Sequence, residues 1–396
     1  MKRYLSRELL LSLFLTFLVL ALYLARTHPS GMLGAGEREK KESLATLVFA
    51  GDVMVHDSQI EAAYRPEDGS YSFYSCFEPL KEITARADLA VINLETVLAG
   101  EELGYTGYPA FNTPESLARA LKEAGFDLVC TANNHSLDRG ETGVLKTLEH
   151  LEAAGLKSFG TYSSREAREK PLLVETKGIK IAFLAYTYDT NGIPLPENKE
   201  YLVNMLDPEL IIADIHRVRR RADLVVLYIH WGLEYHREPS PEQQKLASLL
   251  FREGADIIVG NHPHVVQPIE FIKFPYRREL KEGVVAYALG NVTGDQIQPY
   301  TDSGILLFVR VRMEEPSRKV EIVEVSYVPT WIHRFYRDGR RDFRVLPLLP
   351  EESYWRRLEE DPYLTPGNLL QLQQLQEEMR EHLRYVPQGL PAETPR

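Results

Sequence analysis

The sequence predicts an α/β fold, and two of its features lead to this prediction. Between residues 45 and 291, short runs of β-branched and apolar residues alternate with amphipathic stretches of helical periodicity. Such alternation is typical of parallel sheets covered by helices. Polar residues also stand where the apolar runs end: Asp52, Glu95, Asn134, His135, His230, His262, His264 and Asn291. Ligands bind outside the carboxyl ends of strands in open α/β folds, so the pattern predicts a site at that edge.

The composition is that of a globular protein with a full core. Of the 396 residues, 44% are hydrophobic and 26% are charged, which are ordinary fractions for such proteins. The formal net charge of −11 argues against general nucleic-acid binding, because that requires a basic surface which displaces counterions. We therefore expect no nucleic-acid partner.

Residues 1–26 predict a transmembrane signal anchor. Lys2, Arg3 and Arg7 precede an uninterrupted apolar run over 9–25, which Arg26 closes. This length is near the lower limit of about 17–25 residues for a span. Basic residues in front place the N-terminus in the cytoplasm and the main domain outside the cell membrane. No clear A-x-A cleavage site follows; the alternative is a buried helix of a soluble protein.

The elements follow in order after a flexible linker over 27–45, which is rich in Gly, Ser and charged residues. A main domain over 46–313 has strands predicted at 45–54, 88–95, 126–135, 180–189, 223–232, 255–264 and 283–291. Helices are predicted at 76–87, 113–125, 140–155 and 240–254. For the helix at 113–125, Thr113 and Glu115 are expected at its start and Gly125 at its end.

The C-terminal part, 314–396, departs from the alternation. Residues 319–335 predict strands that extend or cap a sheet, and 364–385 predict one amphipathic helix with a stripe of Leu369, Leu370, Leu372 and Leu375. The tail 386–396 is expected to be disordered.

Six of the strand-end residues are candidate metal ligands: Asp52, Glu95, Asn134, His230, His262 and His264. Carboxylate, amide and imidazole groups together suit Mn, Zn or Fe, and one or two divalent ions are expected. Two ions would polarise a phosphoryl oxygen and activate water. A sharp turn at Pro263, or regular alternation in a strand, would bring both neighbouring histidines to one point. The alternatives are packed histidines, an Asx turn and a helix cap.

The motifs GDVM, NLE, TANNHSLDRG, HWGLEY and GNHPHVVQP, in this order, resemble the CapA / PgsA family of capsule and poly-γ-glutamate synthesis proteins, a branch of the calcineurin-like metallophosphoesterases. The resemblance covers residues 47–307. It implies a four-layer α/β/β/α sandwich with the site at the sheet edges. It also implies a membrane-anchored protein that acts with polymerase and export subunits of a capsule complex.

The resemblance also assigns roles to residues of this chain. Asp52, Asn134, His230, His262 and His264 match metal ligands, and Glu95 replaces the usual bridging aspartate. His135 matches a neighbouring histidine that serves as the acid or charge stabiliser in catalysis. Met54 stands where the pattern has a histidine, and thioether is a poor ligand for hard ions. His56 is expected not to substitute for it.

Further residues have weaker assignments. Glu234 and His236 either bind substrate or lie on a solvated loop, and Asn291 is a candidate for the rim of the site. The basic run at 216–221, HRVRRR, is either a docking patch for a polyanion or a solvated helix face. An oxidising compartment would permit one disulfide between Cys76 and Cys130, which spacing alone does not establish. Neither lies in a C-x-x-C pattern, so a structural or free thiol is favoured over a cysteine metal site.

Two functions follow as expectations. The first is a membrane-anchored extracytoplasmic protein of capsule or poly-γ-glutamate synthesis or export, whose metal site hydrolyses or transfers a phosphoester or an anionic surface polymer. The second is a non-catalytic scaffold or polymer-binding subunit of a membrane polymer-synthesis complex. Retention of the late histidines favours the first, and Met54 favours the second.

Overall fold

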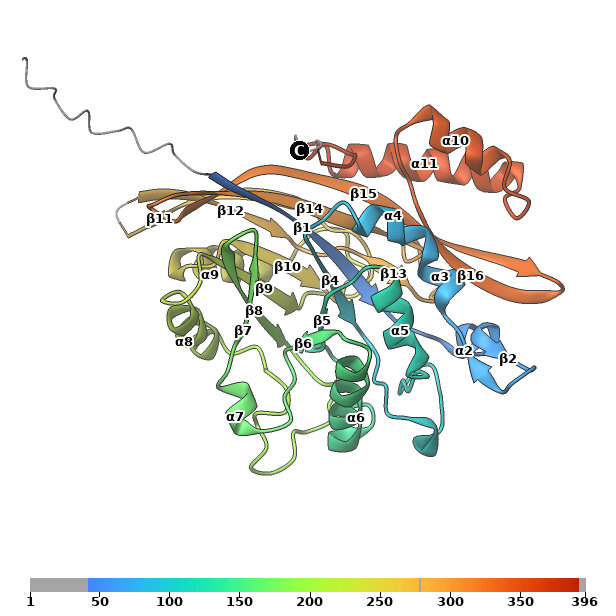
Figure 1. Ribbon diagram of the computed structural model, residues 1–396, viewed down its shortest axis with the longest axis horizontal. Helices are drawn as coiled ribbons and strands as arrows, with labels where there is room; N and C mark the ends of the chain where they lie inside the picture. Colours follow the sequence, from blue (N-terminus) through green and yellow to red (C-terminus); the bar gives the residue numbers. More distant parts are fainter. Residues whose placement is uncertain (1–41, 278, 392–396) are drawn as a thin grey trace, which may run out of the picture.

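Two β-sheets form the centre of the computed structural model, which describes residues 42–277 and 279–391 (Figure 1). The predicted anchor at 1–26 and most of the predicted linker lie outside these residues. In the part of the chain that is described, no helix is both long and apolar enough to cross a membrane. The predicted α/β class is confirmed, since both sheets are mixed and carry helices on their outer faces.

The larger sheet combines an antiparallel half with a parallel half. Its strands lie in the order β16 (Arg340–Pro347), β15 (Lys319–Arg337), β14 (Ser303–Glu314), β1 (Glu42–Val53), β4 (Leu89–Leu94), β5 (Leu128–Cys130) and β6 (Lys157–Phe159). Strand β13 (Asn291–Thr293) pairs with the end of β1 in parallel. Because β1, β4, β5 and β6 are mutually parallel, their carboxyl ends lie at one edge.

The second sheet has a parallel centre with antiparallel edges. Its order is β11 (Ile269–Tyr276), β12 (Glu279–Ala286), β10 (Ile257–Asn261), β9 (Leu224–His230), β8 (Ile179–Thr187) and β7 (Leu172–Thr176). The strands β8, β9, β10 and β12 run parallel. A separate small hairpin joins β2 (Tyr64–Arg65) to β3 (Ser70–Tyr71).

Three apolar layers hold the sheets and helices together. Residues of both sheets, such as Phe49, Phe183 and Tyr228, pack in a shared core between them. The outer face of the larger sheet packs on α2 (Asp57–Ala63), α3 (Tyr74–Phe77), η1 (Glu78–Leu80), α4 (Lys81–Thr84), α5 (Ser116–Glu123) and α6 (Gly140–Ala153). The outer face of the second sheet packs on α8 (Pro208–Val218) and α9 (Pro241–Glu253). Two short helices, η2 (Glu101–Leu103) and α7 (Arg165–Arg168), lie in connections.

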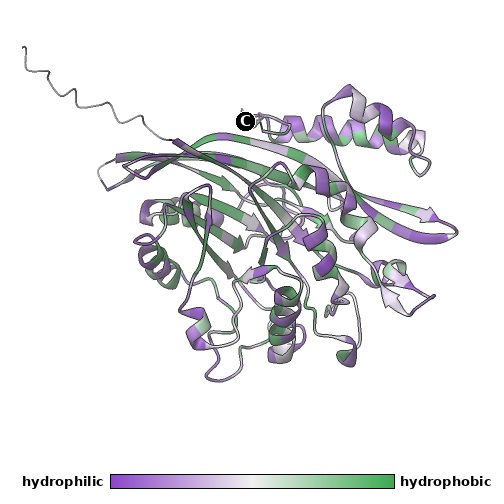
Figure 2. Ribbon diagram, in the orientation of Figure 1, coloured by the Kyte–Doolittle hydropathy of each residue, from purple (hydrophilic) through white to green (hydrophobic). Residues whose placement is uncertain are grey.

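The C-terminal part extends the larger sheet, which is the first of the two predicted possibilities. After β15 and β16, the helices α10 (Glu352–Glu359) and α11 (Pro366–His382) add Leu358, Leu372 and Leu375 to the core between the sheets. Figure 2 shows hydrophobic strands at the centre and a hydrophilic tip on the β15–β16 hairpin.

Four local predictions were wrong. Leu370 is 56% exposed, because helical spacing turns it away from the buried side of α11. Strand β5 ends at Cys130 rather than at His135. Glu115 stands at the N-cap position of α5 as expected, although its side chain bonds with Tyr105, whereas Thr113 lies before the helix start and bonds with Thr96. The predicted start of the disordered tail, at residue 386, was too early, since the backbone of Tyr327 in β15 hydrogen-bonds with Pro387 and Gly389.

A candidate metal centre at the strand ends

The six predicted ligands converge at the carboxyl edge of the two sheets. Three of them, Asp52, Glu95 and Asn134, come from the ends of β1 and β4 and from the loop after β5 in the larger sheet. The second sheet contributes His230 at the end of β9, and His262 and His264 just after β10. All six side chains are buried. Ligand atoms of two groups lie within 4.8 Å of one another: Glu95, His262 and His264 in one group, and Asp52, Glu95 and His230 in the other.

Glu95 occupies the centre of this cluster. Its Oε1 lies 3.4 Å from Nε2 of His230 and 3.7 Å from Nε2 of His264. Nδ1 of His264 lies 3.3 Å from Oδ2 of Asp52, and Nε2 of His230 lies 2.9 Å from Oδ1 of Asn134. Glu95 belongs to both groups of ligand atoms, which is the position that a carboxylate bridging two ions would take.

Several buried atoms of the cluster have no hydrogen-bond partner. They are both carboxylate oxygens of Glu95, Nδ1 of His230 and Nδ1 of His262. Buried polar atoms in native proteins are almost always hydrogen-bonded, because an unpaired one costs about 1–3 kcal/mol. The imidazole contacts of Glu95 do not meet the geometry of a hydrogen bond, so these atoms keep their lone pairs. Four unpaired atoms in one cluster of carboxylate and imidazole groups fit a divalent metal ion.

The pKa shifts in the cluster favour the same chemistry. Burial raises the pKa of Glu95 well above its ordinary value, and the neighbouring Asp52 carboxylate raises it further. Burial also lowers the pKa of His230 well below its ordinary value and that of His262 to about 2, with nearby histidines adding to both shifts. The two imidazoles are therefore neutral at physiological pH, as ligands must be. A cation would replace the proton that burial favours on Glu95.

The segment that carries the last two histidines has a strained backbone. His262 has φ of 99° and His264 has φ of 59°, values that residues other than glycine rarely adopt. Because β10 ends at Asn261, the turn around Pro263 brings both rings to the cluster, and the alternative of a regular strand was wrong. The backbone N–H of His262 donates to Oδ2 of Asp52 at 3.2 Å. Strain of this kind collects at functional sites.

A layer of asparagines holds the ligands in place. Asn93 donates from Nδ2 to Oδ1 of Asp52 at 2.8 Å, and the Asn261 amide donates to the same oxygen at 3.2 Å in the orientation that satisfies both of its ends. Asn291 contacts Nδ1 of His264 through Oδ1 at 3.1 Å and is fully buried. Its predicted place at the rim was therefore wrong. Asn93 was missed, although an asparagine within a buried apolar strand could have indicated it.

We expect Asn291→Ala to weaken metal binding by about 10–100-fold, because a ligand histidine loses the partner that fixes its ring. Titration of the metal-free protein with Mn²⁺ and Zn²⁺ measures this effect. Gln296→Ala serves as the matched control, since Gln296 accepts from the other end of the Asn291 amide and does not contact His264. Equal affinity in wild type and Asn291→Ala would contradict the assignment.

His135 lies beside the cluster and is oriented by a buried carboxylate. Its Nδ1 is 2.7 Å from Oδ2 of Asp138, and a carboxylate can only accept, so Nδ1 carries the proton. Asp138 Oδ2 also accepts from the backbone of Phe111, whose ring packs 4.6 Å from the imidazole. His135 is thus held with Nε2 as its remaining proton-transfer atom. Asp138 was missed, although it stands three residues later in the same motif.

The predicted substrate residues on the β9–α9 loop are exposed. The negative charge of Glu234 adds a smaller contribution to the raised pKa of Glu95. The ring of His236 contacts the backbone oxygen of Glu234 through Nδ1 at 2.9 Å, and its backbone oxygen accepts from Gln267 at 2.8 Å. Two tyrosines that the sequence did not single out lie closer. The ring of Tyr188 is 4.6 Å from that of His262, and the ring of Tyr235 is 6.2 Å from that of His264.

Met54 stands where the family pattern has a histidine, and the structure shows how it and the nearby His56 are placed. Met54 is buried. His56 accepts from the backbone N–H of Asp295 through Nδ1, and its ring packs against Phe111 at 5.4 Å. Within the described residues it belongs to neither group of close ligand atoms. The expectation that His56 does not take the place of the missing histidine stays consistent with this arrangement.

Two other sequence features lie away from the cluster. Cys76 and Cys130 are buried free thiols, so no disulfide joins them. In the basic run 216–221, Arg217 and Arg219 pair with Asp214 and Asp256 at 2.7 and 2.6 Å. The charges of Arg217 and Arg219 are therefore neutralised by carboxylates of this chain, which weakens the case for a docking patch for a polyanion.

A family comparison agrees with this geometry. Residues 46–296 match the family described as bacterial capsule synthesis protein PGA_cap. The chain belongs to this family. The match includes the strand ends that carry all six candidate ligands, together with His135.

Two curated relatives are similar to this chain over most of their length. The capsule biosynthesis protein CapA of Bacillus anthracis is 28% identical over 77% of this chain and 72% of its own. The PGA biosynthesis protein CapA of Bacillus subtilis (strain 168) is 28% identical over 80% of both chains. Among solved structures, the NAD nucleotidase of Haemophilus influenzae has a TM-score of 0.44 and 12% identity over 86% of this chain and 61% of that one.

Proposed function

We propose that this PGA_cap protein is a metal-dependent hydrolase that cleaves a phosphoester, or a bond of an anionic surface polymer, during capsule synthesis or export. The observation that carries the proposal is the Glu95 carboxylate, which is fully buried, has no hydrogen bond and lies between the imidazoles of His230 and His264. Burying such a group without a partner is costly, and one or two divalent cations supply the partner.

The residues of the site would have different roles in the reaction. Asp52, Glu95, Asn134, His230, His262 and His264 would hold the ions, and Glu95 belongs to both groups of close ligand atoms. When bound, divalent ions polarise a phosphoryl oxygen and lower the pKa of coordinated water. His135 donates Nδ1–H to Asp138; with a second proton on Nε2, as an imidazolium that the Asp138 carboxylate stabilises, it would transfer that second proton to the leaving group. Glu234 lies on the exposed β9–α9 loop, and its charge adds to the raised pKa of Glu95.

Elemental analysis and turnover of a phosphodiester test this proposal, before and after His264→Ala. We expect the purified wild type to contain Mn, Zn or Fe, and the variant to lose affinity for the ion by at least about 100-fold, with a similar loss of turnover. His216→Ala is the matched control, because His216 pairs with Glu253 on an exposed helix surface. A wild type that binds none of these ions, or an unaffected variant, would falsify the metal site.

A second candidate function rests on Met54. Because a thioether stands at the first-motif position, the cluster would hold fewer ions than a catalytic pair, and the protein would act as a non-catalytic subunit that binds polymer or organises polymerase and export subunits. Co-purification of such subunits with Glu95→Ala and His262→Ala variants favours this function. Turnover by the wild type with no membrane partner counts against it.

Membrane attachment is part of the proposal. The apolar run at 9–25, with basic residues before it, supports a single-pass anchor whose N-terminus is cytoplasmic and whose main domain is extracytoplasmic. Protease added to intact cells would then remove the main domain and leave the anchor protected.

A further inference from the structure

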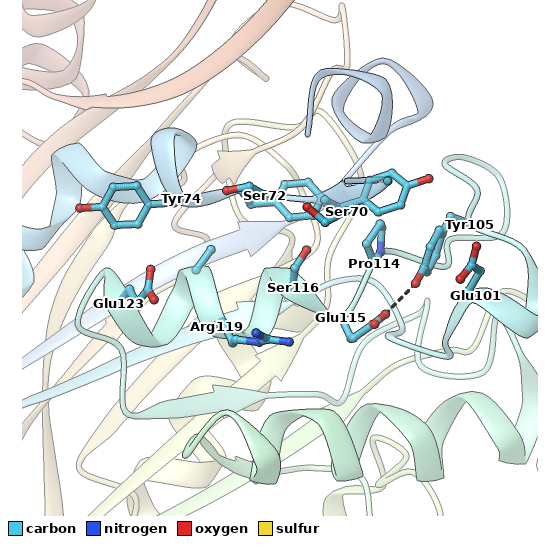
Figure 3. A pocket seen from close by; sticks show the side chains of 14 residues that line it. Ser70, Ser72, Tyr74, Glu101, Tyr105, Pro114, Glu115, Ser116, Arg119 and Glu123 are labelled. Carbon is cyan, nitrogen blue, oxygen red and sulfur yellow. Dashed lines mark hydrogen bonds between the residues drawn. The ribbon is translucent and has the colours of Figure 1, made fainter. Parts of the chain in front are cut away.

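A cavity on the far side of the loop at 101–111 is separate from the metal centre. It has a volume of about 380 Å³ and lies between the β2–β3 hairpin with its following residues, the loop around Tyr105, and the first turns of α5 (Figure 3). This volume falls in the range of about 300–1,000 Å³ that is usual for small-molecule sites. None of the six candidate metal ligands lines it.

Tyrosine rings form much of its wall. Tyr71 packs edge-on against Tyr105 at 5.2 Å and against Tyr64 at 5.3 Å. Tyr74 is 44% exposed and also lines the cavity. Tyrosines supply flat apolar surface and a polar tip at a low cost in conformational entropy. A cavity walled by them suits a ring-shaped ligand that is partly polar.

The polar groups of the cavity include both donors and acceptors. Ser116 points into it (Figure 3), and its buried Oγ has no hydrogen-bond partner. Arg119, one turn later on α5, has Glu115 as an electrostatic neighbour, and within the described residues its guanidinium makes no hydrogen bond. Glu115 accepts from the Tyr105 hydroxyl at 2.7 Å. Glu101 and Glu123 add two exposed carboxylates.

The charged and polar groups of the cavity bear on whether an anionic, a cationic or a neutral ligand fits it. Three carboxylates against one guanidinium disfavour an anion, because like charges repel. The three carboxylates would attract a cation, and the guanidinium of Arg119 in the same wall offsets one of these charges. A neutral hydroxylated ring satisfies both kinds of group, since each hydroxyl donates to a carboxylate and accepts from Arg119 or Ser116. We propose that this cavity is a saccharide-binding site, with the tyrosine rings against the sugar face.

The loop at 101–111 connects this site to the metal centre. Tyr105 forms the cavity wall, and six residues later the ring of Phe111 packs on His135. Gly107 between them is fixed by its N–H, which donates to Asp57 at 2.6 Å. A glycan held in the cavity would therefore lie next to the loop that supports His135, while binding there needs no metal.

Calorimetric titration of the full chain with neutral oligosaccharides tests the proposal, using maltotriose, cellotriose and chitotriose as probes. We expect at least one to bind, and Tyr74→Ala and Arg119→Ala each to weaken it by about tenfold or more. Both residues reach the surface, so the variants should fold; the midpoint of thermal unfolding checks this. Ser116→Ala is a smaller change that removes only the unpaired hydroxyl. Tyr336→Ala is the matched control, since Tyr336 is 70% exposed on the β15–β16 hairpin.

Three results would overturn the assignment. The first is that no neutral oligosaccharide binds to the wild type. The second is that binding persists unchanged in the folded Tyr74→Ala, Arg119→Ala and Ser116→Ala variants. The third is that lysine trimer or glutamate pentamer binds more tightly than the sugars and is lost in the same variants. Because chelation of metal is irrelevant to each result, failure here is distinguishable from failure of the proposed hydrolase.

Discussion

Glu95→Gln is expected to abolish metal binding and to reduce phosphodiester turnover by at least about 1,000-fold. The amide keeps the size of the side chain but removes the charge that would bridge two ions. Glu95 contacts both His230 and His264, so its loss affects both groups of ligand atoms at once. Elemental analysis of the purified variant and its turnover with added Mn²⁺ measure the two effects.

In the metal-free protein, Glu95→Gln is expected to increase the free energy of unfolding rather than to impair the protein. Because burial raises the pKa of Glu95, the folded state holds a proton that the unfolded state releases above pH about 4.5. The stability that this carboxyl contributes is therefore present below that pH and is lost as pH rises through the folded pKa. We expect Glu95→Gln, measured in chelator, to gain free energy of unfolding relative to wild type between pH 5 and pH 8.

Urea unfolding at several pH values checks this, and the comparison of variant with wild type cancels most of the contribution of the histidines. Glu115→Gln is the matched control, because Glu115 is half-buried, accepts a hydrogen bond from Tyr105 and lies outside the cluster. If the difference in free energy between Glu95→Gln and wild type does not change with pH, Glu95 is not the buried proton-binding group described above.

His135→Ala is expected to lower turnover by about 100–10,000-fold while metal content stays unchanged. A positioned acid or base contributes a factor of this size, and the residue is absent from both groups of close ligand atoms. Single-turnover kinetics with an activated aryl phosphodiester and with an alkyl one separate its role. The loss should be smaller for the activated ester, whose leaving group needs less protonation.

Asp138→Asn provides the comparison for that measurement. Phe111 N–H and Nδ1 of His135 both contact Oδ2 of Asp138, so an amide oxygen at that position keeps both hydrogen bonds but removes the negative charge that stabilises a protonated imidazole. We expect an intermediate loss of turnover and an altered pH profile. A loss of metal in either variant would mean that His135 holds an ion rather than transferring a proton.

Much of the site could be predicted because chemistry and periodicity point to the same positions. Asp52, Glu95 and His230 interrupt apolar runs at the ends of strands, and a parallel arrangement brings such ends to one edge. The strands themselves follow from their apolar runs, as β9 and β10 show. The family resemblance added the role of His135 and the sandwich of two sheets.

The rest depends on tertiary contacts that no local pattern encodes. Asn291 was placed at the rim because its position after a strand resembles that of the ligands, but pairing of β13 with β1 buries it beneath His264. Thr113 has the residue type of a helix cap, yet its hydroxyl bonds with that of Thr96, 17 residues earlier in the connection from β4 to α5. The nearness of Tyr188 to His262 depends on a backbone hydrogen bond between Tyr188 and His230.

The equal division of the six ligands between the two sheets has a consequence for assembly of the chain. Each half of the sandwich brings three donors to a shared seam, so neither half can complete the site without the other. An ion bound to donors from both sheets would therefore stabilise their packed arrangement relative to any state in which the two sheets have separated.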